Sequence, residues 1–475
     1  MPPEIDLFSA RRGSVTAPAG CGKTQLIADT LKLHDEEKPV LVLTHTNAGK
    51  SALEARLTKG AVPKRAYRVS TIDSWAIRLI SKFPTRAGHD PEVLRLENRS
   101  RDYPAIRVAA RNLLKQGDIS DVLRASYSRL IVDEYQDCSI PQHRIVGWTA
   151  QVLPTCVLGD PLQAIFDFVE PTVDWEADVS KHFPELGPLE TPWRWRNAGA
   201  ENLGKWLLQC RKSLFAGRAV DLRGAPSEVS WVELSANADE AHQQRLTAAR
   251  TRVPTARDTV LIIGDSTKPK GQQQFASVTP GATTVEAVDL RDLTSFGKSF
   301  DPSSKNAMSE LIEFAADHMT NLGATELLRR LDALGRETAR RKDLTATEEA
   351  ALAFKSAPTM RAALIALKAF EAAPDVRVYR PEPLHVCKAA MQTAASGECT
   401  FYDAVVKARE RNRHLARATG RRAVGSTLLL KGLEADVAVV LNPAEMNARN
   451  LYVALTRGAK RLVVCSRTSV LSPSR

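Results

Sequence analysis

The chain has 475 residues, about three times the usual length of one domain, and we expect two to four domains with full hydrophobic cores. Lys and Arg outnumber Asp and Glu by 66 to 55, a net charge of +11. This balance favours a polyanionic partner, although arginine-rich solvated helices would produce it equally well. The seven cysteines form no C-x-x-C pair and no Cys/His pair at zinc spacing, which argues against a structural metal and fits a reducing cytoplasm. No run of 18 apolar residues occurs, so we expect neither secretion nor a membrane span.

The first motif is a glycine-rich loop in TAPAGCGKTQL, which begins at residue 16. It follows a β-rich run and leads into apolar residues at helical spacing. A strand, loop and helix in this order place backbone N–H groups and a positive helix end around a polyphosphate. Lys23 is then expected on the β- and γ-phosphates and Thr24 on Mg²⁺. Ala17 stands where the general pattern has its first glycine, and a plain glycine turn before a helix is the alternative.

Paired carboxylates follow a short apolar run in RLIVDEYQDCS, residues 129–139. The run is too short for a helix and suits a central parallel strand that presents acids at its carboxyl end. Asp133 is expected to hold Mg²⁺ and Glu134 to orient and deprotonate the attacking water, whereas a solvated strand end is the alternative. A third predicted strand lies in TCVLGDPLQAIFDF, residues 155–168, and its apolar run precedes Gln163. The neutral amide of Gln163 can sense a γ-phosphate.

These segments resemble superfamily 1 DNA helicases of the UvrD/Rep type, whose motifs occur here in the family's order along nearly the whole chain. The family's phosphate loop usually reads A-x-A-G-x-G-K-T, so APAGCGKT is its ordinary form. LETPWRWR (189–196), STLLLKGLEADVAVVLN (426–442) and RNLYVALTRGAKRLVV (449–464) resemble its later motifs. The resemblance implies ATP and Mg²⁺ as cofactors, with Trp193 against the adenine and Glu434 on the ribose. The implied nucleotide contacts are Ala17, Pro18, Ala19, Gly20, Cys21, Gly22, Lys23, Thr24, Gln25, Trp193 and Glu434.

Two arginines complete the catalytic set that the resemblance implies, which also contains Lys23, Glu134 and Gln163. Arg194 is expected near the γ-phosphate, with Arg196 as the alternative at that place. Arg457 is expected to be the arginine finger on the second domain, with a surface helix arginine as the alternative. An arginine that places its positive charge beside the departing γ-phosphate can raise the rate of hydrolysis by about 10³ to 10⁵.

The resemblance also implies a surface for single-stranded DNA or for single/double-strand junctions. VLVLTHTNAGKSALEARL (40–57) and VSTIDSWAIRLI (69–80) look like the family's DNA-contacting segments. Among aromatic residues that could stack on bases, Phe168 comes first and Trp75 second, although Trp75 can equally be a core residue. The basic stretch 407–422 is either a stripe that binds the phosphate backbone or a solvated helix face. The expected DNA contacts are Thr44, His45, Thr46, Asn47, Thr71, Asp73, Trp75 and Phe168.

Several positions depart from the family pattern. The N-terminal segment lacks the glutamine that reads adenine, which puts a strict preference for ATP in question. His45, Asp73, Val169 and Leu428 replace the usual residues of segments that contact DNA or couple it to ATP. Because the residues for hydrolysis remain, we expect hydrolysis more firmly than efficient unwinding.

The implied fold is α/β, with two RecA-like P-loop domains that have parallel sheets and reduced helical insertions. We expect the first domain (1A) over residues 1–200 with a short 1B-like insertion at about 82–126. The second domain (2A) is expected over 201–475 with a helical 2B-like insertion at about 295–415.

The expected function is that of a cytoplasmic ATP-dependent DNA helicase or translocase, moving 3′ to 5′, in DNA repair, recombination or phage defence. The compact form resembles helicases of Gabija-type phage-defence systems, which accompany nucleases, so a nuclease partner is expected. Two alternatives stay open. One is a DNA-stimulated ATPase that acts as the regulatory or sensor subunit of a nuclease complex, and the other is a P-loop kinase or nucleotide transferase.

Overall fold

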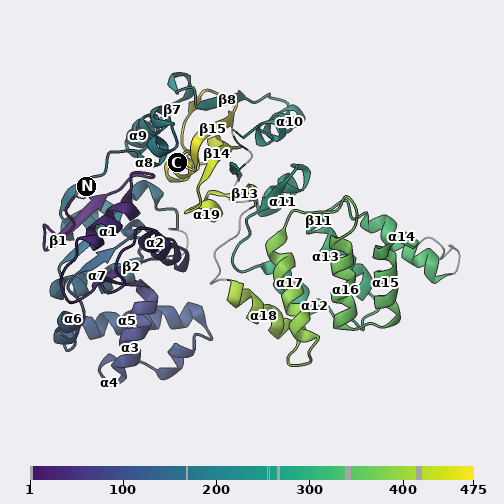
Figure 1. Cartoon of the computed structure of the whole chain (residues 1–475), viewed down its shortest axis with the longest axis horizontal. Helices are drawn as coiled ribbons and strands as arrows, with labels where there is room; N and C mark the ends of the chain where they lie inside the picture. The colour runs from purple at the N-terminus through teal and green to yellow at the C-terminus, as the bar shows by residue number, and fades with distance from the viewer. Residues whose placement is uncertain are drawn as a thin grey trace. The chain divides into compact units, whose positions relative to one another are not determined.

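The computed structural model describes residues 4–166, 170–253, 255, 257–264, 268–336, 344–412 and 420–474 (Figure 1). Its contacts divide the chain into two compact units. The first comprises Met1–Trp231, Pro443–Leu462 and Thr468–Arg475, and the second comprises Val232–Asn442 and Val463–Arg467. Among the described residues, no helix is both long enough and apolar enough to cross a membrane.

A six-stranded sheet forms the centre of the first unit, in the order β3-β2-β4-β5-β1-β6. Neighbouring strands run parallel throughout. The three strands β2, β4 and β5 are buried at every residue, as expected of a parallel sheet that helices cover on both faces. The strands are β1 (Arg12–Thr16), β2 (Val40–Thr44), β3 (Tyr67–Thr71), β4 (Leu130–Val132), β5 (Thr155–Gly159) and β6 (Glu185–Pro188).

Alternate residues of these strands enter two apolar cores, one on each face of the sheet. Leu41 and Leu43 belong to the core that includes α3, α5 and α7, whereas Val40 and Val42 belong to the core that includes α1 and α2. The helices are α1 (Lys23–Lys32), α2 (Asn47–Lys59), α3 (Ile72–Lys82), α5 (Arg99–Gln116) and α7 (Ile140–Val152). Since all the carboxyl ends of parallel strands lie at one edge, the segments after β1, β2, β4 and β5 come together there.

Helices also fill the expected first insertion, residues 82–126. They are α4 (Pro84–Ala87), the 3₁₀ helix η1 (Pro91–Arg95), α5 and α6 (Ser120–Ser126), and α5 packs against α3 and α7. After the sheet come α8 (Trp193–Asn197) and α9 (Glu201–Phe215), and α20 (Ala448–Leu455) packs against α9. Shorter elements of this unit are the 3₁₀ helices η2 (Tyr135–Asp137), η3 (Pro161–Gln163) and η5 (Leu222–Gly224), the π-helix η4 (Trp175–Ser180), and the paired strands β7 (Val220–Asp221) and β16 (Val470–Leu471).

A second six-stranded sheet has the order β10-β13-β9-β14-β15-β8. Its central strand β9 runs parallel to both neighbours, and β13 also runs parallel to β10. The strands are β8 (Val229–Glu233), β9 (Val260–Gly264), β10 (Ala282–Thr284), β13 (Arg422–Ser426), β14 (Ala435–Val440) and β15 (Gly458–Ser466). The helices of this region are α10 (Ala238–Ala249), α11 (Pro269–Val278) and α19 (Thr427–Leu430).

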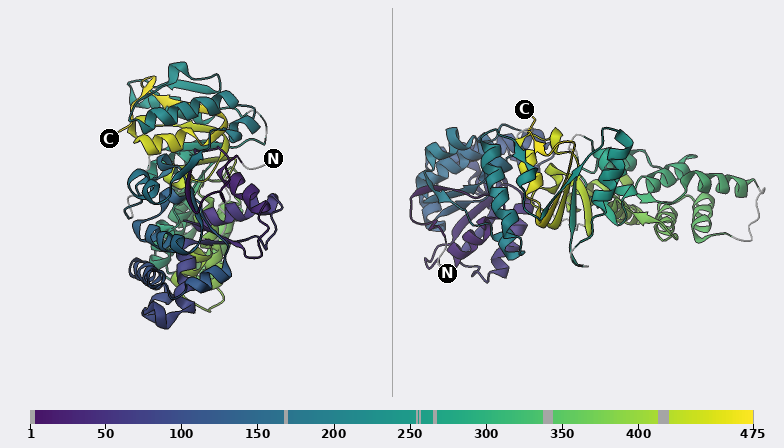
Figure 2. Two further views of the ribbon diagram at one scale, coloured as in Figure 1. Left: turned by 90° about the vertical axis from the view of Figure 1, so that its left-hand side faces the viewer. Right: turned by 90° about the horizontal axis from the view of Figure 1, so that it is seen from above.

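A block of helices with its own apolar core separates β10 from β13 in the chain. Helices α13, α15 and α16 pack side by side, as the green ribbons of Figures 1 and 2 show. The block contains α12 (Arg291–Ser299), α13 (Ala307–Ala316), α14 (Ala324–Gly335), α15 (Ala346–Ser356), α16 (Met360–Glu371), α17 (Pro381–Ala394), α18 (Phe401–Asn412) and the two-residue strands β11 (Met319–Thr320) and β12 (Arg377–Val378). It occupies the range expected for the second insertion.

The predicted fold class is confirmed: the chain has two RecA-like α/β domains with parallel sheets and flanking helices. The last strand of the first sheet, β6, ends at Pro188, and the first strand of the second sheet, β8, begins at Val229. The domain boundary that we expect near residue 200 lies between these two strands. The compact units differ from the expected domains in two ways. The first unit extends to Trp231, and it also includes Pro443–Leu462. Of the basic stretch 407–422, residues 413–419 lie outside the described part of the chain.

Candidate nucleotide-binding site

The phosphate loop connects β1 to α1 through two glycines with left-handed backbone. Gly20 has φ 70° and Gly22 has φ 85°, a conformation that favours glycine. A Cβ at Gly20 would lie 2.6 Å from the ring of Trp195, and one at Gly22 would lie 3.0 Å from Trp193. The loop is therefore curved as a phosphate cradle requires and packs closely against α8.

Ala17 is a packed residue of this loop. Its side chain is fully buried in the core with α1, and its N–H donates to the carbonyl of Gly159 at 2.8 Å, which prolongs the contact between β1 and β5. Its φ is not positive, so the position makes no conformational demand for glycine. The alanine therefore leaves the shape of the loop intact.

Lys23 joins the loop to the paired carboxylates. As the first residue of α1, it places its Nζ 2.8 Å from Asp133 Oδ1 and 2.6 Å from Glu134 Oε1. Burial alone lowers the pKa of Lys23, but the two carboxylates together outweigh burial and raise this pKa above its ordinary value. Lys23 is therefore a fixed cation. Burial raises the pKa of Asp133 above its ordinary value, and the charge of Lys23 opposes this rise.

Glu134, the second residue after β4, has a left-handed backbone with φ 54°. Strained conformations of this kind concentrate at functional sites. Its N–H donates to Asp133 Oδ1 at 2.9 Å, and its Oε2 accepts a hydrogen bond from Gln136 Nε2 at 2.6 Å. The turn thus directs both carboxylates toward Lys23.

Asp160, at the end of β5, joins three further side chains. Gln163 Nε2 donates to Asp160 Oδ2 at 3.1 Å, and two nitrogens of Arg211 donate to Asp160 Oδ1 at 2.9 and 3.1 Å. The N–H of Asp160 donates to Gln136 Oε1 at 3.1 Å. The sequence analysis assigned no role to Gln136, although it lies within VDEYQD, or to Arg211, for which no sequence pattern gave a signal.

Helix α8 presents two aromatic rings and two arginines. Arg194 donates through its backbone N–H to Gly20 O at 3.0 Å and through Nη1 to Thr456 O at 2.6 Å. Arg196 instead pairs with Glu201 at 2.9 Å on the exposed side and lies over the ring of Trp193. The geometry therefore brings Arg194, and not Arg196, beside the phosphate loop. Trp193 is 41% exposed, as a ring that stacks on a base must be.

The motif YVALTRG, around α20, contacts the loop directly within the first unit. The N–H of Ala19 donates to the hydroxyl of Tyr452 at 3.0 Å, and burial raises the pKa of Tyr452 well above its ordinary value, so the phenol is neutral. Trp195 Nε1 donates to Gly458 O at 2.8 Å.

Arg457 lies in the turn after α20 and is 3% exposed, so the alternative of a surface helix arginine is wrong. Its Nε donates to Val453 O at 2.9 Å and its Nη2 to Thr456 Oγ1 at 3.2 Å. We expected Arg457 on the second domain, but the contacts group residues 443–462 with the unit that carries Lys23. Glu434, the expected ribose ligand, lies exposed in the second unit before β14.

The first expected DNA segment follows β2. Thr46 accepts a hydrogen bond from Gly49 N at 3.0 Å and caps α2, which begins at Asn47. The buried atoms Thr44 Oγ1 and His45 Nδ1 have no hydrogen-bond partner among the described residues. Buried polar atoms are usually paired, so two adjacent unpaired ones indicate a place where a ligand can supply partners.

In the second expected DNA segment, around β3 and α3, the side chains of Thr71 and Asp73 already have hydrogen-bond partners within the protein. Thr71 caps α3 by accepting from Ser74 N at 3.1 Å. Asp73 accepts two hydrogen bonds of 2.7 Å from Arg107, which also bonds Glu170 at 2.7 Å. Asp73 thus has a structural partner that the sequence did not reveal.

Trp75 is a correction to the expected DNA surface. Its ring is 2% exposed and lies in the core between the sheet and α3, α5 and α7, so it cannot stack on a base. The alternative that it is a core residue is confirmed. Phe168, the first choice for stacking, lies outside the described residues.

The residues expected at the metal are suited to Mg²⁺ by their chemistry. Thr24 supplies a hydroxyl and Asp133 a carboxylate, and oxygen donors of this kind together with substrate phosphates are the usual ligands of this ion. The described residues include no group of three or more His, Cys, Asp or Glu side chains that could hold a metal ion. An all-protein metal cage is therefore not seen in this part of the chain, and the expected site needs the phosphates to complete it.

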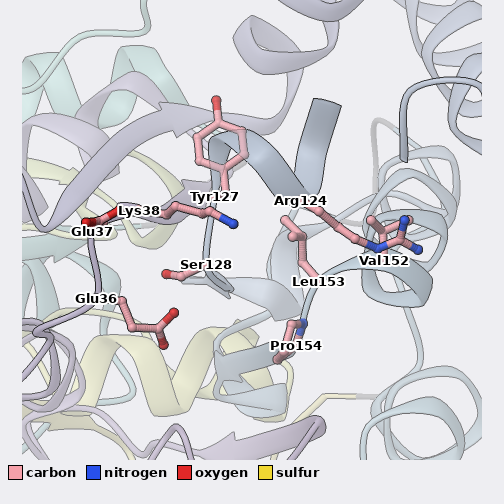
Figure 3. Close-up of a pocket in the computed structure, with 9 residues that line it drawn as sticks. All are labelled: Glu36, Glu37, Lys38, Arg124, Tyr127, Ser128, Val152, Leu153 and Pro154. Atoms are coloured by element: carbon pink, nitrogen blue, oxygen red, sulfur yellow. The ribbon is translucent and has the colours of Figure 1, made fainter. Parts of the chain in front are cut away.

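A separate cavity of 470 Å³ lies at the opposite edge of the first sheet (Figure 3). Its lining comes from the segments that precede β2, β4 and β5, whereas the phosphate loop and the carboxylates follow strands. The cavity is therefore no part of the nucleotide site. Its lining residues are Glu36, Glu37, Lys38, Arg124, Tyr127, Ser128, Val152, Leu153 and Pro154.

Comparison with known proteins supports the class that the fold and the loop define. Residues 92–184 match the UvrD/REP helicase N-terminal domain. No curated protein matches the chain. Among solved structures, it is similar to Pif1 helicase from Candida albicans, at 13% identity over 57% of this chain and 52% of that one, with a TM-score of 0.31. The match thus spans about half of that structure, and a likeness this distant carries no argument here.

The chain has the fold of P-loop proteins with two RecA-like domains. Over residues 92–184 it is similar to the N-terminal domain of UvrD/REP helicases, in agreement with the resemblance of its motifs.

Proposed function

We propose that this chain hydrolyses ATP, with Mg²⁺, and uses the energy to move 3′ to 5′ along single-stranded DNA. The observation that carries the proposal is the double contact of Lys23 with Asp133 and Glu134 at the mouth of the phosphate loop. A lysine that ends on the two acids of the next motif is placed to exchange them for phosphate oxygens. A plain structural glycine turn has no need of this arrangement.

The proposed reaction begins with that exchange. Lys23 would contact the β- and γ-phosphates, and Asp133 and Thr24 would then be the residues that hold Mg²⁺. The metal, when bound, neutralises charge on the phosphates. Glu134 then orients the attacking water and accepts its proton, while Gln163 senses the γ-phosphate.

The arginines act on the same phosphate. Arg194 is held beside the loop through Gly20 O, and Arg457 follows the helix whose Tyr452 contacts the loop. To reach the γ-phosphate, Arg457 exchanges its hydrogen bond to Val453 O for a phosphate oxygen. Both guanidinium groups then stabilise the charge that develops on the departing phosphoryl group.

The proposed DNA contact lies at the same edge of the sheet. Strand β2 is the neighbour of β4, so Thr44 and His45 follow a strand adjacent to the one that carries Asp133. Thr44 Oγ1 and His45 Nδ1, which have no hydrogen-bond partner in the described part of the chain, support this assignment. We propose that bound DNA, or a single/double-strand junction, shifts this edge and so raises the rate of hydrolysis.

A second candidate function is a DNA-stimulated ATPase that serves as a regulatory or sensor subunit of a nuclease complex. The observation that favours it is the Arg107 contact of Asp73, because both carboxylate oxygens of this expected DNA ligand already have a partner. In either case we propose action in the cytoplasm, in DNA repair, recombination or phage defence. The P-loop kinase alternative is disfavoured, because residues 92–184 match a helicase domain.

Strand displacement separates the two candidates. The isolated chain, ATP and Mg²⁺ are incubated with a labelled duplex that carries either a 3′ or a 5′ single-stranded tail. The helicase proposal predicts displacement from the 3′-tailed duplex only. Displacement that appears only after a nuclease encoded beside this chain is added supports the regulatory subunit, and displacement from 5′ tails alone contradicts the proposed direction.

A further inference from the structure

Arg211 forms a largely buried ion pair with Asp160 beside the nucleotide site. It extends from α9, its side chain is 15% exposed, and it donates two hydrogen bonds to Asp160 Oδ1, whose carboxylate is 1% exposed. Burial by itself lowers the pKa of Arg211, but Asp160 outweighs burial and raises it. A carboxylate this deeply buried requires a cation, and Arg211 provides it with two nitrogens.

Asp160 also forms hydrogen bonds with two other residues of the site, Gln163 and Gln136. Its Oδ2 accepts from Gln163 Nε2 at 3.1 Å, and its N–H donates to Gln136 Oε1 at 3.1 Å. Gln136 in turn donates to Glu134 Oε2 at 2.6 Å. One hydrogen-bonded chain therefore connects Arg211 with both the γ-phosphate sensor and the general base of the proposed reaction.

The two oxygens of Asp160 have different partners. Arg211 takes Oδ1, together with the N–H of Leu162 at 3.3 Å, which leaves Oδ2 for Gln163. A carboxylate accepts hydrogen bonds only, so it fixes which end of the Gln163 amide turns toward it and which end turns away. Without the arginine, the carboxylate would lose its two strongest contacts and could turn, which would displace the Gln163 amide that donates to Oδ2.

We infer that Arg211 is a positioning residue for ATP hydrolysis, acting through Asp160 on Gln163 and Glu134. It need not touch the nucleotide. The inference rests on the proposed function, because it assumes that Gln163 and Glu134 act on ATP. Helix α9 also packs against α20, so the same helix contacts the segment that carries Tyr452.

A double-mutant cycle on basal ATP hydrolysis, without DNA, tests the inference. Arg211→Lys keeps the charge beside Asp160 but loses the two-nitrogen contact, and we expect kcat to fall roughly tenfold, as a small displacement of a catalytic group can cause. In the Gln163→Ala background the same substitution should lower kcat clearly less than it does in the wild type, because one of the two groups that it positions is gone. Introducing Arg211→Lys into either background should change the affinity for a non-hydrolysable ATP analogue by less than about twofold, because Arg211 does not contact the nucleotide.

Lys212→Met is the matched control, since Lys212 is the next residue of α9 and is exposed. It should leave kcat and the cycle unchanged. If Arg211→Lys does not fold, as judged by its melting temperature, the neutral pair Arg211→Gln with Asp160→Asn replaces it in the same cycle.

Equal loss of kcat in both backgrounds would overturn the inference, because it would mean a general structural effect. An unchanged kcat in Arg211→Lys would overturn it too. A wild-type rate that ignores single-stranded DNA contradicts the proposed motor but leaves the cycle measurable, so the two failures are distinguishable. A wild-type chain that hydrolyses no ATP at all would overturn both.

Discussion

The Nζ of Lys23 lies 2.6 Å from Glu134 Oε1, so the cation of the phosphate loop and the proposed general base form an ion pair. Asp133 shares the same ammonium at 2.8 Å. A nucleotide that binds to Lys23 therefore competes with two carboxylates, and binding and activation of Glu134 become one event. Each element of this relationship can be tested separately.

Replacing the base should separate hydrolysis from binding. We expect Glu134→Gln to lower kcat by roughly 10² to 10⁴, the range that general-base catalysis contributes. The affinity for ATP should not fall, because Lys23 loses one competing carboxylate. Single-turnover phosphate release and equilibrium binding measure the two effects. Glu37→Gln, at the opposite edge of the sheet, is the control, and an unchanged kcat in Glu134→Gln would remove this residue from the mechanism.

The exposed ring of Trp193 should determine how well the base of the nucleotide binds. We expect Trp193→Ala to raise KM for ATP roughly tenfold with little change in kcat, since an aromatic pair contributes about 0.5–1.5 kcal/mol beyond its area burial. Trp193→Phe should restore most of the affinity. Steady-state kinetics measure both, with Trp231→Ala in β8 as the control. A fall in kcat at unchanged KM would contradict the stacking role.

The Arg107 contact with Asp73 and Glu170 should stabilise the first unit. Arg107 is mostly buried, and Arg107→Met leaves two acids without their cation, so we expect the free energy of unfolding to fall by about 2–4 kcal/mol. Urea denaturation measures the change. Arg124→Met, which breaks an exposed pair with Asp121, should cost less than about 1 kcal/mol. If the two variants were equally stable, the contact would have no structural role.

Stability should also depend on pH through His318 in the helical block. Burial, and then Arg380, lower the pKa of His318 to about 4, against the opposing effects of Glu286 and Asp292. Between an unfolded pKa of about 6.5 and this value the unfolded chain binds more protons, so the free energy of unfolding falls on acidification, by about 3 kcal/mol from this group. The contribution of neutral His318 is complete above about pH 6.5 and lost as the pH approaches 4.

The comparison with His318→Asn isolates this effect, because an asparagine amide can replace the Nδ1 contact with Phe314 O. Urea denaturation at pH 7 and pH 4.5 should show a smaller loss of stability in the variant than in the wild type. His385→Asn, on the exposed side of α17, should behave as the wild type does. Identical losses in all three chains would show that His318 is not the titrating group.

Features that depend on neighbouring residues could be predicted from the sequence, and long-range contacts could not. The glycines of the phosphate loop and the acids after β4 leave local patterns, because strand periodicity and loop chemistry are local properties. The contact of Arg211 with Asp160 joins residues 51 positions apart and has no such signature. Burial of Trp75 likewise depends on which face of α3 meets the sheet. Asp73 departs from the family pattern, and the structure gives the physical reason: its carboxylate binds Arg107, which is 34 positions away in the sequence.

The most direct test of the account is the rate of ATP hydrolysis by the wild-type chain with increasing single-stranded DNA, beside Lys23→Ala as the inactive reference. We predict that the wild-type rate rises strongly with DNA and saturates, and that Lys23→Ala hydrolyses no ATP at any DNA concentration. Because phosphate contacts are ionic, the DNA concentration at half-maximal stimulation should rise with salt. A wild-type rate that is the same with and without DNA would contradict the motor, and turnover by Lys23→Ala would contradict the site.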